Sequence, residues 1–75
     1  MRDPNRIDGY VEKLKECWKQ VPDWRFGQFM SNVLAEIEYA TKRDIFYVED
    51  KELFETMEKI FKAWKENKSY EDYVN

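Results

Sequence analysis

Hydrophobic residues recur at helical spacing in three stretches of the chain, and polar residues fill the positions between them. Apolar side chains three or four residues apart lie on one side of an α-helix, so each stretch predicts an amphipathic helix. The pattern places these helices near residues 4–20, 24–40 and 51–66. Together they predict an all-α fold, with one small three-helix domain spanning residues 1–75.

The first predicted helix begins near Pro4, because Asp3 can accept hydrogen bonds from free N–H groups and proline fits a first helical turn. Its apolar stripe consists of Ile7, Tyr10, Val11, Leu14, Trp18 and Val21. Pro22 disfavours helical geometry at the preceding residue, and Asp23 can cap the helix that follows. We therefore expect a very short connection between the first two helices.

The second predicted helix has a hydrophobic side and an opposite side without formal charge. The hydrophobic side contains Phe26, Phe29, Met30, Val33, Leu34, Ile37 and Ala40. The opposite side contains Trp24, Gln28, Ser31, Asn32, Ala35 and Tyr39. A solvent-exposed side normally carries Lys and Glu, so the uncharged side indicates a second contact. We expect this helix to be the central element, contacted on two sides.

Small residues recur at every fourth position beside this uncharged side, at Gly27, Ser31 and Ala35. Such a ridge allows another element to approach closely. Glycine in a helix interior costs about 1 kcal/mol relative to alanine, so packing or turn geometry is expected to compensate at Gly27. We expect Ser31 and Ala35 to pack against another part of the same chain.

The segment Ile45–Val48 is rich in strand-forming residues, but no second strand is predicted to pair with it. We expect an extended or single-turn connector whose Ile45, Phe46 and Val48 fill the core. Asp50 is the expected N-cap of the third helix, whose stripe consists of Leu53, Phe54, Met57, Ile60, Phe61 and Trp64. Residues 69–74 resemble a capping arrangement and predict one further helical turn. The predicted core contains Trp18, Phe29, Val33, Phe54, Ile60 and Phe61.

The composition and net charge of the chain limit the classes of function that it can have. Thirteen Lys plus Arg against sixteen Asp plus Glu give a net charge of −3, which provides no general attraction to nucleic acid or anionic membrane. No apolar run approaches the roughly 18 residues that span a bilayer, so we expect a soluble cytoplasmic protein. A single cysteine, Cys17, and no histidine exclude an internal disulfide, a Cys/His metal site and a Cys-His nucleophile pair. We predict no enzyme, no metal and no cofactor, with Cys17 serving as a small hydrophobe.

Residues 44–58 are acidic, with six Asp or Glu side chains and one lysine, Lys51. Such a cluster can bind a basic partner or mimic nucleic acid. Its commoner meaning is helix capping and a solvated face. Acid–base catalysis requires a carboxyl group that is buried enough to raise its pKa, and the pattern indicates no such burial here.

Several short motifs resemble known sequences. The spacing of Ile7, Leu14, Trp18, Pro22-Asp23, Gln28-Phe29 and the later acidic and apolar segment is similar to the YihD-like family of short bacterial proteins of unknown function. The segments at residues 2–7, 22–28 and 44–50 also resemble short phage and Gram-positive bacterial proteins without an assigned function. The resemblance covers residues 2 to about 60. It implies a helical cytoplasmic protein and supplies no catalytic residues.

The function favoured by the sequence is a protein–protein interaction or regulatory module that presents a helix face to another protein. Trp, Tyr and Arg are common interface anchors. The candidate interaction residues are Trp24, Arg25, Gln28, Asn32 and Tyr39. The alternative is that the third helix or the tail covers this face. The chain itself is expected to be a monomer or a weak homodimer.

Nucleic-acid binding is the second candidate function. Two helices joined by a tight turn suggest a helix-turn-helix, with Arg25, Gln28, Ser31 and Asn32 on the recognition helix. That helix has one Arg and no Lys before Lys42, so its attraction to phosphate is weak. Lysines on the first helix alternate with glutamates, which is typical of a solvated face. Enzyme activity is the least favoured class.

Overall fold

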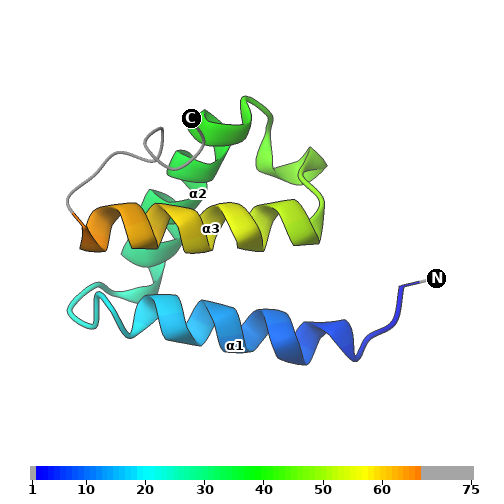
Figure 1. Ribbon diagram of the computed structural model, residues 1–75, viewed down its shortest axis with the longest axis horizontal. Coiled ribbons are helices and arrows are strands. Elements are labelled where there is room, and N and C mark those ends of the chain that lie inside the picture. Colours follow the sequence, from blue (N-terminus) through cyan, green and yellow to red (C-terminus); the bar gives the residue numbers. More distant parts are fainter. Residues whose placement is uncertain (1, 67–75) are drawn as a thin grey trace.

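The structure of the chain is a computed structural model that describes residues 2–66. It contains three α-helices and one 3-10 helix, namely α1 (Arg6–Trp18), α2 (Phe26–Thr41), η1 (Ile45–Tyr47) and α3 (Asp50–Lys65) (Figure 1). The predicted all-α fold with three helices and a short connector is confirmed. The helical turn predicted at residues 69–74 lies outside the described residues.

The helix α1 begins two residues later than predicted because a turn precedes it. The Asp3 carboxylate accepts a hydrogen bond from the N–H of Asn5 at 2.9 Å. The N–H groups of Arg6 and Ile7 then donate to the carbonyls of residues 3 and 4, at 3.2 and 3.1 Å. Asp3 therefore organises the start of the chain, as expected, but it caps a turn and α1 itself starts at Arg6.

The connection between α1 and α2 is fixed by an indole group. The Nε1–H of Trp18 donates to the carbonyl of Trp24 at 3.0 Å, so the last residue of α1 holds the chain just before α2. The expectation that Asp23 caps α2 is wrong. The N-cap is Arg25, whose N–H donates to the Gln28 side-chain oxygen at 2.9 Å. A side chain in the first turn of α2 thus accepts a hydrogen bond from the N–H of the N-cap residue, as in one half of a capping box.

The helix α2 ends where Lys42 takes the left-handed conformation, with φ of 58°. The single-turn connector η1 follows, and Asp44 accepts a hydrogen bond from the N–H of Phe46 at 2.9 Å. In one helical turn, residues three apart share a side, so Val48 is buried and Ile45 is half-buried. Phe46 points the other way and is 82% exposed, so the expectation that it fills the core is wrong.

The helix α3, rather than α2, is the central element. It packs against both α1 and α2, which diverge from their short connection (Figure 1). Residues of α1 meet residues of α3 that lie 44 or 45 positions further along the chain, which shows two parallel helices in constant register. The pairs are Arg6–Asp50 at 3.0 Å, the rings of Tyr10 and Phe54 at 4.5 Å, and Lys13–Glu58 at 2.7 Å.

The first of these pairs replaces a predicted cap. The N-cap of α3 is Glu49, and Asp50 is the first helical residue, so the expectation that Asp50 caps α3 is wrong. Its carboxylate instead contacts the guanidinium groups of Arg6 at 3.0 Å and Arg2 at 3.6 Å. A carboxylate at a helix N-terminus still interacts favourably with the helix dipole.

The core lies between α2 and α3. Phe29 is fully buried and its ring packs on Phe61 with centroids 5.7 Å apart. The buried hydrophobic residues are Cys17, Phe29, Val33, Ile37, Val48, Met57, Ile60, Phe61 and Ala63. Four of the six predicted core residues are therefore buried. Trp18 and Phe54 are only partly buried, because Trp18 lies on the open side of α1 and Phe54 covers Tyr10 at the edge.

Candidate interaction surfaces

The outer face of α2 is exposed. It consists of Gln28, Ser31, Asn32, Ala35 and Tyr39, all of which are exposed and none of which carries a formal charge. The opposite side of the helix holds the buried Phe29, Val33 and Ile37. Since α3 occupies that buried side and α1 diverges, no helix among residues 2–66 covers the outer face.

The expectation that a ridge of small residues packs within the chain is wrong for the described residues. Ser31 and Ala35 are exposed. A Cβ atom added at Gly27 would meet nothing within 4 Å. The expectation that α2 is the central helix, contacted on two sides, is also wrong for the described residues. The helix α3 is the one that packs against two other helices, and the side of α2 opposite its buried residues is exposed.

The five candidate interaction residues differ in their surroundings. Trp24 and Gln28 have structural roles: Trp24 is half-buried, with its ring edge-on to Trp64 at 5.9 Å, and Gln28 binds the N–H of Arg25. Arg25 is exposed at the start of α2. Asn32 and Tyr39 lie two turns apart on the outer face, about 10 Å along the helix axis. The structure thus keeps Gln28, Asn32 and Tyr39 on the outer face but does not gather all five side chains.

Tyr39 is the most prominent apolar group of this outer face. Its side chain is 70% exposed. The Lys42 ammonium lies over its ring, 5.8 Å from the centroid, which is within the range of a cation–π contact. The neighbouring Glu38 carboxylate accepts a hydrogen bond from the N–H of Ile45 at 3.1 Å. Charged side chains therefore lie at both ends of α2, Arg25 at the N-cap and Lys42 at the C-cap, with Glu38 beside the outer face.

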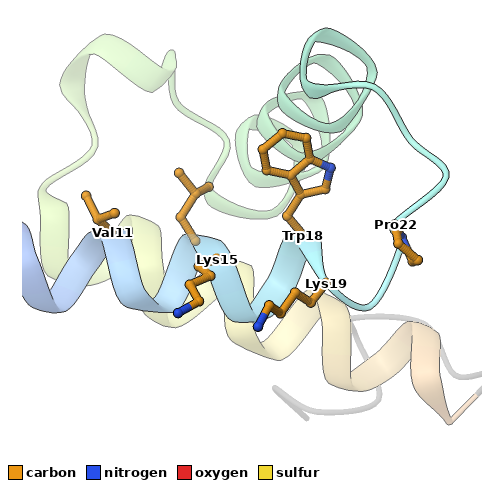
Figure 2. A pocket seen from close by; sticks show the side chains of 6 residues that line it. Val11, Lys15, Trp18, Lys19 and Pro22 are labelled. Atoms are coloured by element: carbon orange, nitrogen blue, oxygen red, sulfur yellow. The ribbon is translucent and has the colours of Figure 1, made fainter.

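A second surface lies on α1, where the sequence predicted core. An open groove of about 450 Å³ is lined by Val11, Leu14, Lys15, Trp18, Lys19 and Pro22. Figure 2 shows Val11 and Trp18 on one side of α1, with the amines of Lys15 and Lys19 pointing away from them. Ile7 and Val11 are 48% and 53% exposed, so the N-terminal half of the predicted apolar stripe is open.

The helix α1 has this open stripe because its contact with α3 uses a different side. Arg6, Tyr10, Lys13 and Cys17 face α3, and the stripe of Ile7, Val11, Leu14 and Trp18 is displaced from them by one residue, or about 100°. The C-terminal half of the stripe is half-buried, because Leu14 and Trp18 pack against the core, Trp18 through ring contacts with Phe26 and Phe29. The unusual width of the apolar pattern on α1 was the sequence signal for this surface.

The acidic stretch is largely used in ion pairs. Arg2 contacts Glu49, Arg43 contacts Glu52, and Lys13 contacts Glu58. The hydrogen bond to Glu58 raises the pKa of Lys13. These pairs link α1, the residues before it and the segment after α2 to α3 or its N-cap. The paired side chains are largely exposed, as expected for a solvated face, and Asp44 caps η1, but no side chain within residues 2–66 caps α3.

Cys17 is the buried α1 residue of the core, as predicted. Burial raises the pKa of its thiol to about 11, and the charges of Glu58 and Glu16 act in the same direction. A thiol with a high pKa is a poor nucleophile at neutral pH, because little thiolate is present. Within residues 2–66, no three His, Cys, Asp or Glu side chains are placed to hold a metal ion.

The described chain is therefore a small three-helix protein with two exposed helix faces, one uncharged on α2 and one apolar on α1. No helix within residues 2–66 has the length and apolar character needed to cross a bilayer. Comparison of the chain with models of protein families, with curated proteins and with solved structures gives no match. The resemblance to the YihD-like family stays a prediction.

Proposed function

We propose that the protein is a protein–protein interaction module that presents the outer face of α2 to a helix of another protein. The observation that carries the proposal is the exposure of an uncharged face spanning Ser31, Asn32, Ala35 and Tyr39. Interfaces are depleted in charge at their centre and enriched in aromatic residues. An exposed helix face without charge is unusual for a solvated surface.

The small side chains of Ser31 and Ala35 give the centre of this face a low profile. A partner helix can approach such a surface closely and pack its own side chains beside the small residues. Asn32 can donate and accept hydrogen bonds next to the contact. Tyr39 supplies a large apolar ring with few rotatable bonds and is the expected anchor at the C-terminal end.

Arg25, Trp24 and Gln28 lie at or just before the N-terminal end of α2, and of these three Gln28 belongs to the outer face. Arg25 is exposed at the N-cap and offers one positive charge to an acidic group of the partner. The Trp24 ring packs edge-on against Trp64, and the Gln28 side chain accepts a hydrogen bond from the N–H of Arg25, so both side chains hold the start of α2 in place. Their variants therefore weaken binding mainly by loosening the start of α2.

The experiment compares Ser31→Leu and Ala35→Leu with Lys59→Leu, which adds a leucine at an exposed position of α3. Tagged proteins are used to capture partners from the native cell, and captured proteins are identified by mass spectrometry. Because Ser31 and Ala35 are exposed, the variants should melt like wild type. We expect them to lose a partner that wild type and Lys59→Leu retain, and the identified partner should bind at least tenfold more weakly by calorimetry.

Two outcomes contradict the proposal. In the first, the leucine variants keep every partner with wild-type affinity, which shows that the outer face contacts no other protein. In the second, the variants melt at lower temperature by an amount equivalent to the roughly 1 to 3 kcal/mol cost of overpacking, which shows that the face packs within the chain.

Nucleic-acid binding is the alternative function, favoured by the exposure of Arg25, Ser31 and Asn32 on the first two turns of α2. The Gln28 oxygen is already bound to the N–H of Arg25, so Gln28 is not free to pair with adenine through both of its polar atoms. Glu36 and Glu38 follow on the same helix and repel phosphate. Duplex DNA retained at low salt and released as salt rises, with loss on Arg25→Glu, would support this alternative.

We propose no catalytic role for the chain. The single cysteine is buried and its thiol pKa is raised, so it is unsuited to nucleophilic catalysis.

A further inference from the structure

The apolar stripe of α1 is bordered on its outer edge by four charged residues in the order acid, acid, base, base. They are Asp8, Glu12, Lys15 and Lys19, and all four are exposed. Each follows directly after a residue of the stripe, which consists of Ile7, Val11, Leu14 and Trp18. The charged edge therefore runs beside the stripe for the whole length of α1.

This charge order is complementary to itself when the helix is reversed. A second α1 laid antiparallel on the first places Asp8 opposite Lys19 and Glu12 opposite Lys15. The same alignment places Ile7 opposite Trp18 and Val11 opposite Leu14. In a parallel two-fold pair, the charged edge of one helix would instead lie beside the opposite edge of the other, so these four charges would not pair with their copies. We infer that the stripe of α1 binds a second copy of this chain, with the two α1 helices antiparallel across a two-fold axis.

The shape of the surface supports this partner. The groove lined by Val11, Leu14, Trp18 and Pro22 is open and apolar, and it lies at the end of the stripe where the antiparallel copy brings its Ile7 (Figure 2). The Phe26 ring contacts Trp18 at a tilt of 49°, with centroids 5.2 Å apart, and is 50% exposed, so it extends the apolar surface beside the groove. A self-complementary patch of this kind is the requirement for an isologous dimer.

Forming the dimer requires little rearrangement of the existing ion pairs. Lys15 contacts Glu12 of its own helix at 3.5 Å, and both side chains are more than half exposed, at 55% and 58%. Exposed pairs of this kind contribute little to stability. Lys15 can therefore exchange its partner for Glu12 of the second copy. The side of α1 that faces α3 is unaffected.

The inference goes beyond the proposed function and uses a different surface, so each can fail alone. It is tested by sedimentation velocity on the full chain, at concentrations up to about 1 mM to include weak association. Wild type is compared with Lys15→Glu/Lys19→Glu and with Asp8→Lys/Glu12→Lys. The control is Glu16→Lys, because Glu16 is exposed on the side of α1 away from the stripe. Circular dichroism melts confirm that each variant is folded.

We expect wild type and Glu16→Lys to dimerise. Each double variant turns attraction into repulsion at two kinds of pair, each present twice, and each exposed pair contributes roughly a factor of two to five. Each double variant alone should therefore dimerise at least about tenfold more weakly. An equimolar mixture of the two should form a heterodimer. The quadruple variant, with all four charges reversed, should dimerise with itself and not with wild type.

The last result is specific to the antiparallel arrangement, because reversing all four charges restores complementarity only between opposite ends of the helix. A wild-type chain that stays monomeric at every concentration overturns the inference. So does a dimer that persists unchanged in both double variants, or a quadruple variant that stays monomeric while folded. A dimer lost on Ser31→Leu and not on charge reversal assigns self-association to α2 instead.

Discussion

Tyr10 stacks on Phe54 with ring centroids 4.5 Å apart and ring planes within 11° of parallel, and this contact joins α1 to α3. It lies between the Arg6–Asp50 and Lys13–Glu58 ion pairs, at 3.0 and 2.7 Å. No direct connection joins α1 to α3, since α2 and η1 intervene. The register of these parallel helices is therefore set by side-chain contacts. Of the three contacts, the partly buried ring pair is the least exposed to solvent.

The stacked pair predicts a measurable coupling. Tyr10→Ala, Phe54→Ala and the double variant should form a thermodynamic cycle with a coupling of about 0.5 to 1.5 kcal/mol, the usual value for an aromatic pair. Urea denaturation gives the four free energies of unfolding. The comparison cycle pairs Tyr10→Ala with Phe46→Ala, because Phe46 is 82% exposed and should be additive with Tyr10. A coupling near zero between Tyr10 and Phe54 would show that the stack does not fix the register.

Phe29 is the centre of the core, and its truncation should largely unfold the protein. Its side chain is fully buried between α2 and α3 and contacts the rings of Trp18 and Phe61. Phe→Ala in such a core costs about 3 to 5 kcal/mol, against a total stability of roughly 5 kcal/mol for so small a domain. The matched control is Phe26→Ala in the same helix, where the ring is 50% exposed and the loss should be less than half as large. A cooperative thermal melt of Phe29→Ala close to wild type contradicts this account of the core.

The indole of Trp18 holds the turn between α1 and α2 through its hydrogen bond to the Trp24 carbonyl at 3.0 Å. Trp18→Phe keeps an aromatic ring beside Phe26 and Phe29 but removes the donor. The expected loss of stability is about 1 kcal/mol for the hydrogen bond. Trp64→Phe is the control, because Trp64 contacts Trp24 edge-on and its indole makes no hydrogen bond within residues 2–66. Equal losses for the two variants would show that ring volume, not the hydrogen bond, stabilises the turn.

The helices themselves were predictable because amphipathic spacing reports burial on one side of a helix. The pattern placed the second helix at 24–40 and the third at 51–66, and the structure has Phe26–Thr41 and Asp50–Lys65. The core side of α2 was also predicted for Phe29, Val33 and Ile37, which are buried, but not for Phe26, which is 50% exposed. Hydrophobic periodicity reports the local geometry of a helix, and the position of each helix and its buried side follow from that local geometry.

Features that depend on which helix meets which were not predictable in this way. The stripe of α1 has core character, yet the helix turns Tyr10 and Cys17 toward α3 and leaves Ile7 half exposed. The predicted N-caps Asp23 and Asp50 were wrong because several side chains near each helix start can accept a hydrogen bond from its free N–H groups. Asp50 pairs with Arg6 across 44 positions, and a sequence window cannot contain both residues. The uncharged face of α2 was recognised, but only the arrangement of α1 and α3 shows that Ser31 and Ala35 stay uncovered.

Burial of Cys17 predicts a loss of stability at high pH. The pKa of its thiol is raised from 9.0 to about 11 in the folded protein. Above about pH 9 the unfolded chain releases this proton first, so the unfolded state binds fewer protons and stability falls as pH rises. The contribution is complete below about pH 9 and is lost by about pH 11, with a total of about 1 to 3 kcal/mol.

The measurement is the free energy of unfolding in urea at about pH 8 and about pH 10.5. The comparison is with Cys17→Ala, which lacks the thiol but keeps every other ionisable group of the chain. Wild type should lose more stability between the two pH values than Cys17→Ala does. Identical losses would show that the thiol is not desolvated in the folded protein.

The two glycines give a final test of how the helices are packed. Gly9 lies inside α1 and Gly27 is the second residue of α2, and a Cβ atom added at either meets nothing within 4 Å. Neither has a positive φ, so alanine fits both backbones. Alanine loses less conformational entropy on folding than glycine does, so Gly9→Ala should stabilise the protein by about 0.5 to 1 kcal/mol. Gly27→Ala should give a smaller gain, because a first-turn position is less constrained by the helix.

Thermal melts of the isolated chain measure both effects, with Gly9→Ala as the reference for a glycine away from the outer face of α2. If Gly27→Ala lowers the melting temperature while Gly9→Ala raises it, another part of the chain packs against the start of α2, and the face is not free. In the other outcome, both alanine variants are more stable than wild type, and Gly27→Ala loses the same partner as Ser31→Leu while Gly9→Ala keeps it. The small residue at position 27 is then required by the partner and not by the fold. The second result is the one we expect, because the cost of glycine in α2 is not offset by any packing within residues 2–66.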